Sequence, residues 1–470
     1  MSDFIGRKRE LDALNTLYRK KGFQMMVLYG RRRVGKSTLL QKFIEGKKAV
    51  FYTAVRSNPR RNLKLLGDYA INALMPSMSG ISFDSYEQLF TWLGEQAKQE
   101  RIVLIMDEFP YIAEQDKSLL SVLQKHIDRE WLFGNMFLIL SGSSISFMED
   151  DVLSEKSPLF GRRTSQMKLK PFNYMEAAEF VPSYAAEEKA VVYGVTGGIA
   201  KYLAMFDDSL PLDENLKALF FSDTGYLYEE PNNLLTQEFK NVALYNAIIE
   251  AVAAGRNRIA TIADLTHLEA TQVSHAVANL VATGILRKDY AITDEHNKRK
   301  VQYVLADNMF RFWYQFVSKA VSLIDYGRGS MYYDSMVKRE LSHYMGSVFE
   351  DMCRCYTMDI GSLGKLSCMV LQVGKWWGTN PSKREETDID VVGIDPLNNK
   401  AVIGECKFRN EPLDKSVVEG LKEREGLIDK KYQVVQYLLF SKSGFSSWVM
   451  ENAERENLYL VDLERLYMLA

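Results

Sequence analysis

Residues 23–37 read FQMMVLYGRRRVGKS, and this stretch decides the fold of the first part of the chain. The apolar run at residues 23–29 predicts a short buried strand, and a helix is expected from about residue 36 to residue 45. Between them, residues 30–37 fit the pattern G-x-x-x-x-G-K-[ST]. In such a loop, successive backbone N–H groups and the helix N-terminus can hold phosphate oxygens. The sequence therefore predicts a nucleoside triphosphate site.

A second motif follows the apolar run at residues 102–106, where Asp107 and Glu108 end an expected strand. Because parallel strands end at one edge of a sheet, Asp107 can support Mg²⁺ beside the loop, and Glu108 is the natural general base for water. Lys36 would reach the β- and γ-phosphates, and the Ser37 hydroxyl would ligate Mg²⁺. The adjacent acidic pair favours the ATPases among P-loop proteins over the small GTPases.

Other polar residues are candidates for the same site. Ser141 and Ser143 follow the strand expected at residues 136–140, where they could sense the γ-phosphate, although small hydroxyl residues also suit an ordinary turn. Arg162 and Arg163 are candidate arginine fingers, supplied in trans if the protein forms a homo-oligomer, or else solvated loop arginines. Both alternatives stay open for each pair.

Composition sets the outer limits. The chain of 470 residues is 47% hydrophobic, and its 59 basic and 61 acidic side chains give a formal net charge of −2, which excludes a wholly disordered chain. No apolar run approaches the roughly 18–20 residues that span a bilayer, and no signal-peptide core is visible, so we expect a cytoplasmic protein without membrane contact. The four cysteines form no paired metal motif and are expected to be free thiols. DNA contact would have to come from local charged patches.

Alternating strands and helices predict an α/β multidomain protein whose first domain is a doubly wound parallel sheet. The expected domains are a P-loop ATPase domain at residues 1–170, a helical lid at 171–233, a winged helix at 234–317 and a nuclease-like α/β domain at 318–470. Within the last domain, a helix is expected at residues 332–358 and strands near residues 367–373, 388–394 and 401–407.

The winged-helix prediction rests on helical segments at 245–253, 261–265 and 270–283, followed by strands at 285–290 and 300–305. Residues 270–283 would form the recognition helix, yet they contain no Arg or Lys, whereas phosphate contacts normally supply most DNA affinity. Residues 298–300, Lys-Arg-Lys, lie near the tip of the expected wing. The sequence therefore leaves DNA contact by this domain open, and the family resemblance described below implies the alternative of an internal lever.

A second constellation lies near the C-terminus. Asp390 begins an apolar strand, and Glu405 and Lys407 lie at the end of the next expected strand across a good turn. This hairpin would place Asp390 beside Glu405, with Lys407 on the same face as Glu405. Two carboxylates can hold Mg²⁺ while a lysine orients water, although Asp388 is a rival for Asp390.

The hairpin, with Glu350 on an upstream helix, resembles the PD-(D/E)XK nuclease fold. That resemblance implies a nuclease-like site formed by Glu350, Asp390, Glu405 and Lys407. The site either cleaves nucleic acid or retains the fold without the activity.

The segments FIGR at residues 4–7, GRRRVGKS, IVLIMDEFPY, LILSGSS, PLFGRR and YGVTGGIAKYL together resemble the bacterial and archaeal ATPase family of the AAA+/STAND group, along the whole chain. The resemblance implies that residues 4–7 flank the adenine and that Gly197 and Gly198 lie beside the nucleotide. A proline commonly follows that glycine pair in the family, and Ala200 stands there in this chain. The predicted ATP-binding residues are Ile5, Gly6, Arg7, Gly30, Arg31, Arg32, Arg33, Val34, Gly35, Lys36, Ser37 and Thr38.

These expectations define a protein that uses ATP and Mg²⁺ and leave three function classes open. The first is an ATP hydrolase with a DNA-processing output. The second is a slow-turnover nucleotide switch whose C-terminal domain serves for binding. The third is a DNA-binding regulator in which the nucleotide only stabilises the fold.

Overall fold

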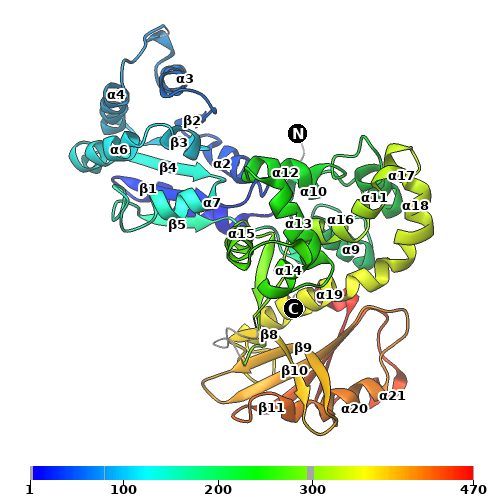
Figure 1. Ribbon diagram of the computed structural model, residues 1–470. Coiled ribbons are helices and arrows are strands. Elements are labelled where there is room, and N and C mark those ends of the chain that lie inside the picture. Colours follow the sequence, from blue (N-terminus) through cyan, green and yellow to red (C-terminus); the bar gives the residue numbers. More distant parts are fainter. Residues whose placement is uncertain (1–3, 79, 294–300, 469–470) are drawn as a thin grey trace. The chain divides into compact units, whose positions relative to one another are not determined.

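The computed structural model describes residues 4–78, 80–293 and 301–468 (Figure 1). The chain divides into two compact units. Residues 1–172 together with 199–201 form the first, and residues 173–198 together with 202–470 form the second.

The first unit contains a five-stranded sheet in which every neighbouring pair of strands is parallel. The spatial order is β2-β3-β4-β1-β5. The strands are β1 (Gln24–Tyr29), β2 (Ala49–Thr53), β3 (Ile102–Asp107), β4 (Met136–Gly142) and β5 (Ser165–Lys168). Every residue of β1, β3 and β4 is buried. Such strands, apolar on both faces, require helices on both sides of the sheet.

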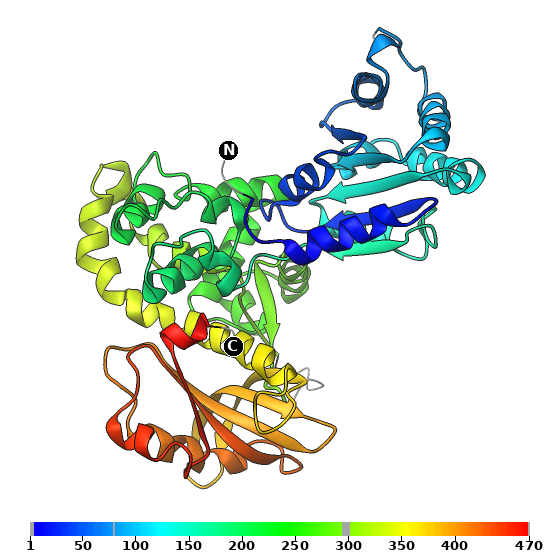
Figure 2. The same ribbon diagram turned by 180° about the vertical axis from the view of Figure 1, so that it is seen from behind.

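Two groups of helices supply this cover (Figures 1 and 2). On one face, α2 (Lys36–Ile44) places Phe43 against Phe137 of β4 and against Tyr18 of α1 (Lys8–Arg19). On the other face, α3 (Pro59–Leu74), α4 (Tyr86–Gln99) and α6 (Ser118–Arg129) share one core with alternate residues of the strands. Shorter elements are η1 (Pro76–Met78), α5 (Pro110–Ala113), η2 (Trp131–Phe133), α7 (Ile145–Phe147) and η3 (Met148–Val152).

The second unit begins with short helices. They are α8 (Tyr174–Ala178), α9 (Ala186–Thr196), α10 (Ala200–Leu203, whose first two residues belong to the first unit), α11 (Leu212–Phe220) and α12 (Glu230–Glu238). Three helices and a two-stranded antiparallel sheet follow: α13 (Val242–Ala253), α14 (Ile259–Thr266), α15 (Ala270–Ala282), β6 (Leu286–Asp289) and β7 (Gln302–Leu305). The basic residues 298–300 of the expected wing lie outside the described residues.

A second five-stranded sheet, in the order β12-β11-β10-β9-β8, lies near the C-terminus. Its strands are β8 (Gln372–Asn380), β9 (Glu385–Asp395), β10 (Lys400–Lys407), β11 (Gln433–Ser441) and β12 (Leu458–Asp462). The first three strands are antiparallel, and the last three are parallel. The 25-residue helix α19 (Lys338–Ser362) contacts β8, β9 and β10.

The remaining helices of the second unit connect or flank these parts. They are α16 (Asn308–Gln315), η4 (Val317–Lys319), α17 (Val321–Asp325), α18 (Gly329–Tyr332), η5 (Tyr333–Val337), α20 (Lys415–Glu423), η6 (Glu425–Leu427), α21 (Ser447–Glu451) and α22 (Leu463–Leu466).

The predicted α/β fold with a parallel sheet is confirmed, and two local expectations are wrong. A strand was expected near residues 367–373, whereas β8 begins at Gln372, where its pairing with β9 starts; this pairing shifts register between Gly374 and Trp376. The helix expected at residues 332–358 is α19, which begins at Lys338 after the π-helical turn η5 and ends at Ser362. Within the described residues, no helix combines the length and the apolar character needed to cross a bilayer.

Gly30 fixes the passage from β1 into the loop. Its φ is 154°, and a Cβ at this position would lie 2.4 Å from the carbonyl oxygen of Leu169. We expect Gly30→Ala to lower the free energy of unfolding of the first unit by about 3 kcal/mol or more, because both the backbone angle and the contact oppose a side chain. Urea unfolding followed by hydrogen exchange of the β1 amides measures the loss.

Gly46→Ala is the matched control. Gly46 also has a positive φ, 71°, but a Cβ there meets nothing within 4 Å. We expect Gly46→Ala to lower the free energy of unfolding by about 1 kcal/mol, from backbone strain alone. Equal losses of unfolding free energy in the two variants would show that the nearby carbonyl oxygen of Leu169 does not exclude a Cβ at position 30.

Candidate functional site

The loop of residues 30–35 curls because three of its residues adopt left-handed backbone. The φ angles are 154° at Gly30, 69° at Arg33 and 94° at Gly35, which is also the N-cap of α2. The N–H groups of the first turn of α2 and the positive end of the helix dipole therefore face the space enclosed by the loop. This is the geometry that an anion such as a polyphosphate requires.

The two predicted motifs meet at one hydrogen bond. Ser37 Oγ donates to Asp107 Oδ2 at 2.7 Å, which joins the start of α2 to the end of β3. Lys36 is 5% exposed, and its Nζ donates to the carbonyl oxygens of Gly30 at 2.9 Å and Arg31 at 3.1 Å. The ammonium group is thus held within the loop.

Two buried oxygens at this edge of the sheet have no hydrogen-bond partner among the described residues: Asp107 Oδ1 and Ser141 Oγ. A buried polar atom without a partner is costly, so both point to a ligand that completes the site. A carboxylate oxygen and a hydroxyl are the hard oxygen donors that Mg²⁺ prefers. Asp107 and Ser37 therefore fit the Mg²⁺ that accompanies a nucleotide triphosphate.

Glu108 and Ser143 lie together across the ends of β3 and β4. Glu108 Oε2 accepts hydrogen bonds from Ser143 Oγ at 2.7 Å and from Ser143 N–H at 3.3 Å. Glu108 has a left-handed φ of 51°, a strained conformation that directs the backbone away from the strand. Ser143 therefore holds the carboxylate that was predicted to act as the base, and the sensor role of Ser141 and Ser143 stays a prediction.

Arg7 joins three segments of the first unit. It is 4% exposed, and its Nη2 donates to the carbonyl oxygens of Val34 at 3.0 Å and Lys170 at 2.8 Å. Its guanidinium lies 3.8 Å from the centre of the Phe172 ring, and it pairs with Glu10 at 3.2 Å. Arg7 thus fixes the start of α1 against the phosphate loop, and the predicted adenine contact of Ile5, Gly6 and Arg7 is untested.

The other predicted arginines have separate surroundings. Arg32 Nη2 donates to Tyr111 Oη at 3.0 Å, next to the acidic motif. Arg162 forms a paired contact with Asp128, at 3.0 and 2.8 Å, and Arg163 donates to the carbonyl oxygen of Leu153 at 2.7 Å. A role as arginine fingers would require Arg162 to leave Asp128.

The short segment 199–201 returns to the first unit after the left-handed glycines Gly197 and Gly198. The Lys201 N–H donates to the carbonyl oxygen of Arg33 at 3.2 Å. A Cβ on Gly35 would lie 3.5 Å from Ala200 Cβ. The residue that replaces the family's proline therefore lies against the phosphate loop.

The predicted residues of the second site come from three elements, as expected. Glu350 lies on α19, Asp390 on β9, and Glu405 and Lys407 on β10. Asp390 and Glu405 are 8% and 7% exposed, and Asp390 Oδ2 accepts the N–H of Cys406 at 2.8 Å. Its rival, Asp388, has an exposed side chain.

Glu405 is engaged by two cations. Its Oε1 accepts from Lys407 Nζ at 2.6 Å, and its Oε2 accepts from Arg424 Nη2 at 2.7 Å. Arg424, at the C-cap of α20, also donates to the carbonyl oxygen of Asp388 at 2.6 Å. A divalent ion at Glu405 would therefore compete with Arg424. Within the described residues, no group of three or more His, Cys, Asp or Glu side chains is arranged to hold a metal.

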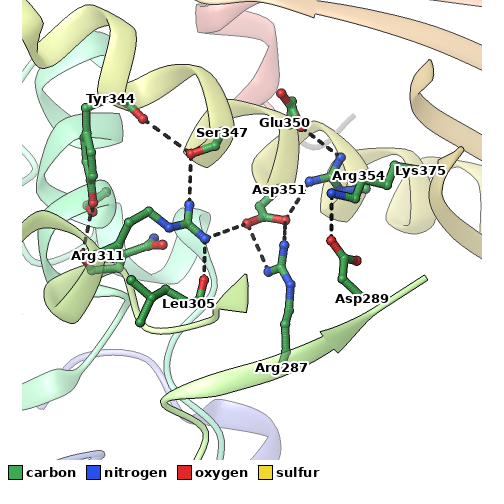
Figure 3. Close-up of polar contacts among 12 residues, drawn as sticks. Arg287, Asp289, Leu305, Arg311, Tyr344, Ser347, Glu350, Asp351, Arg354 and Lys375 are labelled. Carbon is green, nitrogen blue, oxygen red and sulfur yellow. Dashed lines mark hydrogen bonds and ion pairs between the residues drawn. The ribbon is translucent and has the colours of Figure 1, made fainter. Parts of the chain in front are cut away.

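Arg354 pairs with Glu350 and Asp351 of its own helix α19 (Figure 3) and also contacts β9. Its Nη1 donates to the carbonyl oxygen of Asp390 at 2.7 Å and to Glu350 Oε2 at 3.4 Å. Its Nη2 donates to Asp351 Oδ1 at 2.7 Å. One guanidinium therefore fixes Glu350 and Asp390 relative to each other.

Asp351 carries this network onward to the β6–β7 hairpin (Figure 3). It accepts two hydrogen bonds from Arg287 of β6, at 2.9 and 3.1 Å, and lies 3.8 Å from Arg311 of α16. Burial opposes the charge on Asp351, but Arg287, Arg354 and Arg311 outweigh it and hold the pKa of this carboxyl well below its usual range.

The charges of neighbouring acids act on Asp390. Burial, followed by the charges of Glu405 and Glu350, raises the pKa of Asp390 to about 7. Burial also raises the pKa of Glu350. Burial works against the ammonium of Lys407, but the charge of Glu405 outweighs it and raises the pKa of Lys407. A carboxyl that titrates near neutrality beside a fixed lysine is typical of a functional site.

A pocket of about 430 Å³ lies against this cluster. Its lining includes His343, Glu350, Cys406, Lys407, Phe408 and Arg409. The pocket gives a small polar or anionic group access to Lys407 and Glu350 from solvent.

Sequence reasoning missed Arg354, Asp351, Arg287 and Arg424. The spacing of Glu350, Asp351 and Arg354 on one helix was a usable signal, because residues three and four apart are neighbours on a helix surface. Arg287 and Arg424 lie far from their partners in the sequence and had no comparable signal.

Comparison with known proteins finds a similarity over the first part of the chain. Residues 4–206 match a family described as an ATPase domain predominantly from Archaea. Residues 313–425 match a second family, of archaeal and bacterial proteins of unknown function. The chain is therefore similar to an ATPase domain over residues 4–206 and to a family of unknown function over residues 313–425.

Individual proteins are similar to different shares of the chain. An uncharacterized protein of Methanocaldococcus jannaschii is 28% identical over 467 residues, 98% of this chain and 99% of the relative. An uncharacterized ATP-binding protein of the same organism is 47% identical over 45 residues, 10% of this chain and 76% of the relative. The Walker-type ATPase structure of Pyrococcus abyssi has a TM-score of 0.51 at 19% identity, covering 67% of this chain and 96% of that chain. This structure shares the fold of the ATPase domain.

The raised pKa of Asp390 predicts that the stability of the second sheet, β8 to β12, depends on pH. Between about pH 4 and pH 7, folded Asp390 binds a proton that the unfolded chain has released, so the free energy of unfolding falls as the pH rises through this range. The variant Asp390→Asn has no carboxyl at this position, so its free energy of unfolding should not fall in this way. We expect the variant to match the wild type near pH 4 and to exceed it by on the order of 1–2 kcal/mol at about pH 8.

Urea unfolding with a chelator present, followed at the β9 and β10 amides by hydrogen exchange, measures this difference. Asp388→Asn, at an exposed neighbouring position, is the control and should leave the pH dependence unchanged. A wild-type stability that rises between these pH values, with no difference in Asp390→Asn, would contradict the assignment.

Proposed function

We propose that the protein hydrolyses ATP with Mg²⁺ at the phosphate loop. The observation that carries the proposal is the hydrogen bond from Ser37 to Asp107, which brings the two nucleotide motifs together and leaves Asp107 Oδ1 without a partner. Ser37 and Asp107 would hold Mg²⁺, which neutralises charge on the β- and γ-phosphates when it is bound.

The remaining residues of the loop bind and orient the nucleotide. The N–H groups that follow Gly30 in the loop and open α2 surround the phosphates, and Lys36 leaves the carbonyl oxygens of Gly30 and Arg31 to contact them. Glu108 accepts the proton of the attacking water, and Ser143 is a positioning residue that holds its carboxylate at 2.7 Å.

Two substitutions test these roles separately. Lys36→Ala should remove most binding of Mg-ATP, because the phosphates lose their fixed cation. Glu108→Gln should keep binding while lowering kcat about 10²- to 10⁴-fold, the usual contribution of a general base. Isothermal titration calorimetry measures binding, and phosphate release measures turnover.

Glu114→Gln is the matched control, because Glu114 is an exposed acid just beyond α5. It should leave both measurements unchanged. Wild-type turnover in Glu108→Gln would remove Glu108 as the base, and undetectable binding of Mg-ATP by the wild type would refute the proposed function.

The domain arrangement is also proposed. We infer that residues 171–233 act as a lid and that residues 234–317 form a winged helix serving as an internal lever. The β6 strand supports this, because Arg287 pairs with Asp351 of α19 and Asp289 pairs with Lys375 of β8 at 2.7 Å (Figure 3). The hairpin is thereby fastened to the C-terminal domain. A cytoplasmic location, and a homo-oligomer that supplies Arg162 or Arg163 in trans, belong to the same proposal.

A second candidate function is cleavage of a nucleic-acid phosphodiester at the C-terminal acidic site. The raised pKa of Asp390, caused by burial and then by Glu405 and Glu350, favours it, because it indicates three acids gathered beside Lys407. Lys407 would contact the scissile phosphate from the pocket, and Asp390 would hold or release a proton near pH 7. The predicted Mg²⁺ at Asp390 and Glu405 would have to displace Arg424 from Glu405.

Incubation of the protein with Mg²⁺ or Mn²⁺ and labelled DNA or RNA tests this function. Lys407→Ala and Glu405→Gln should lower the cleavage rate at least about 10²-fold. Glu411→Gln, an exposed acid four residues beyond Lys407, should cleave like the wild type. Absence of cleavage by the wild type, or unchanged cleavage in Glu405→Gln, would leave a nuclease-like fold without the activity.

A further inference from the structure

The near-neutral charge of the whole chain conceals a strongly basic segment in the ATPase domain. Residues 13–67 contain 14 Lys and Arg residues and a single acidic residue, Glu45, whereas the whole chain has 59 basic and 61 acidic residues. Such an imbalance over 55 residues creates a local positive potential that attracts polyanions.

Four cations of this segment lie together beyond the end of β2. Arg56, Arg60, Arg61 and Lys64, here called the basic face, are all exposed. Among the residues that the structure describes, none of the four forms an ion pair, and the first acid of α3, Asp68, lies one turn beyond Lys64. Their charge is therefore available to an external partner.

The turn that presents the basic face is rigid. Asn62 is fully buried, and its Nδ2 donates to the carbonyl oxygens of Val55 at 3.0 Å and Ser57 at 3.3 Å. Its Oδ1 accepts from the Val55 N–H at 3.0 Å and from Tyr52 Oη at 2.5 Å. Asn58 caps α3 by accepting the Arg61 N–H at 2.9 Å. A partner would meet cations that are already in place, at the positive end of a 16-residue helix.

An exposed aromatic ring on the same helix narrows the class of partner. Tyr69 is 54% exposed and lies eight residues after Arg61, about two turns further along α3 and about 80° around the helix from it. Its ring centre lies 5.8 Å from that of Tyr52, next to the turn that carries the cations. Arg60 and Lys64, four residues apart, are also neighbours. Cations that contact phosphates beside a ring on which a base can stack are typical of single-stranded nucleic-acid binding, whereas an acidic peptide makes no use of the ring.

The basic face is connected to the nucleotide site of the same unit. The guanidinium of Arg56 lies 4.7 Å from the centre of the Tyr111 ring, and Tyr111 Oη accepts from Arg32 of the phosphate loop at 3.0 Å. The Tyr111 N–H donates to the carbonyl oxygen of Glu108 at 3.0 Å. A phosphate that draws Arg56 away from Tyr111 would therefore act on both nucleotide motifs.

We propose that Arg56, Arg60, Arg61, Lys64 and Tyr69 bind single-stranded nucleic acid and that this binding changes the rate of ATP turnover. The binding step stands independently. The effect on turnover rests on the proposed ATPase function, with Arg56 and Tyr111 as the connection.

Fluorescence anisotropy of the full chain with labelled oligo(dT), without nucleotide and over a salt series, tests the binding step. The variant Arg60→Ala/Arg61→Ala/Lys64→Ala removes three cations of the basic face. We expect about tenfold or more weaker binding at about 100 mM salt and a log–log salt slope reduced by about 2. Tyr69→Ser should weaken oligo(dT) binding about fivefold or more without changing the slope, since a stacked base contributes to affinity without releasing counterions.

The matched control is Arg19→Ala/Lys20→Ala/Lys21→Ala, which removes three exposed cations of the same segment before β1 rather than after β2. It should leave affinity within about threefold of the wild type. Equal weakening by the two triple variants, absence of wild-type binding, or preferential displacement of oligo(dT) by polyglutamate at equal charge would each overturn the proposal.

Phosphate release measured with and without oligo(dT) tests the connection. The basic-face variant should keep the basal rate but lose the response to oligo(dT), because its three residues lie outside the nucleotide site. A full response in that variant would overturn the connection. If the wild type binds oligo(dT) through the basic face but shows no basal turnover, the proposed ATPase function fails while the binding site stands.

Discussion

The hydrogen bond between Ser37 and Asp107 is the contact on which the nucleotide site depends. It joins residues that are 70 positions apart, and it can form only if β1 and β3 end at the same edge of the sheet. That condition follows from the parallel pairing of both strands with β4, whose seven residues are all buried. Burial of these apolar strands therefore does more than stabilise the domain, because it sets the register that brings a hydroxyl and a carboxylate together.

The two acidic sites of the chain have different electrostatic character. At the nucleotide site, Asp107 accepts a hydrogen bond from the Ser37 hydroxyl, and its other carboxylate oxygen has no partner among the described residues. At the C-terminal site, Glu405 is already paired with Lys407 and Arg424, and Arg354 fixes the backbone of Asp390. The nucleotide site can therefore accept a ligand that brings positive charge. At the C-terminal site the acids are already balanced by cations, and an anion can reach it from its pocket.

Sequence patterns predicted the local features of both sites and missed most of the long-range ones. The loop at residues 30–37 and the acids after β3 were identified because their spacing is short and chemically restrictive. The pairing of β9 with β10 followed from a turn, and it places Asp390 beside Glu405 as expected. The positions of Arg287 and Arg424 depend on the packing of distant elements, which no periodicity encodes. The late start of α19 has a similar cause, since the turn at Tyr333–Val337 is π-helical although its sequence suits an ordinary helix.

The return of residues 199–201 to the first unit has a consequence for dissecting the protein. The backbone enters the second unit after residue 172, comes back at residue 199 and leaves again after residue 201. No single proteolytic nick can therefore separate the two units. A fragment that stops at residue 172 would lack the segment 199–201, whose Lys201 N–H donates to the carbonyl oxygen of Arg33. A fragment that extends to residue 206 would retain this segment. The boundary of the matched ATPase family, residues 4–206, includes this returning segment.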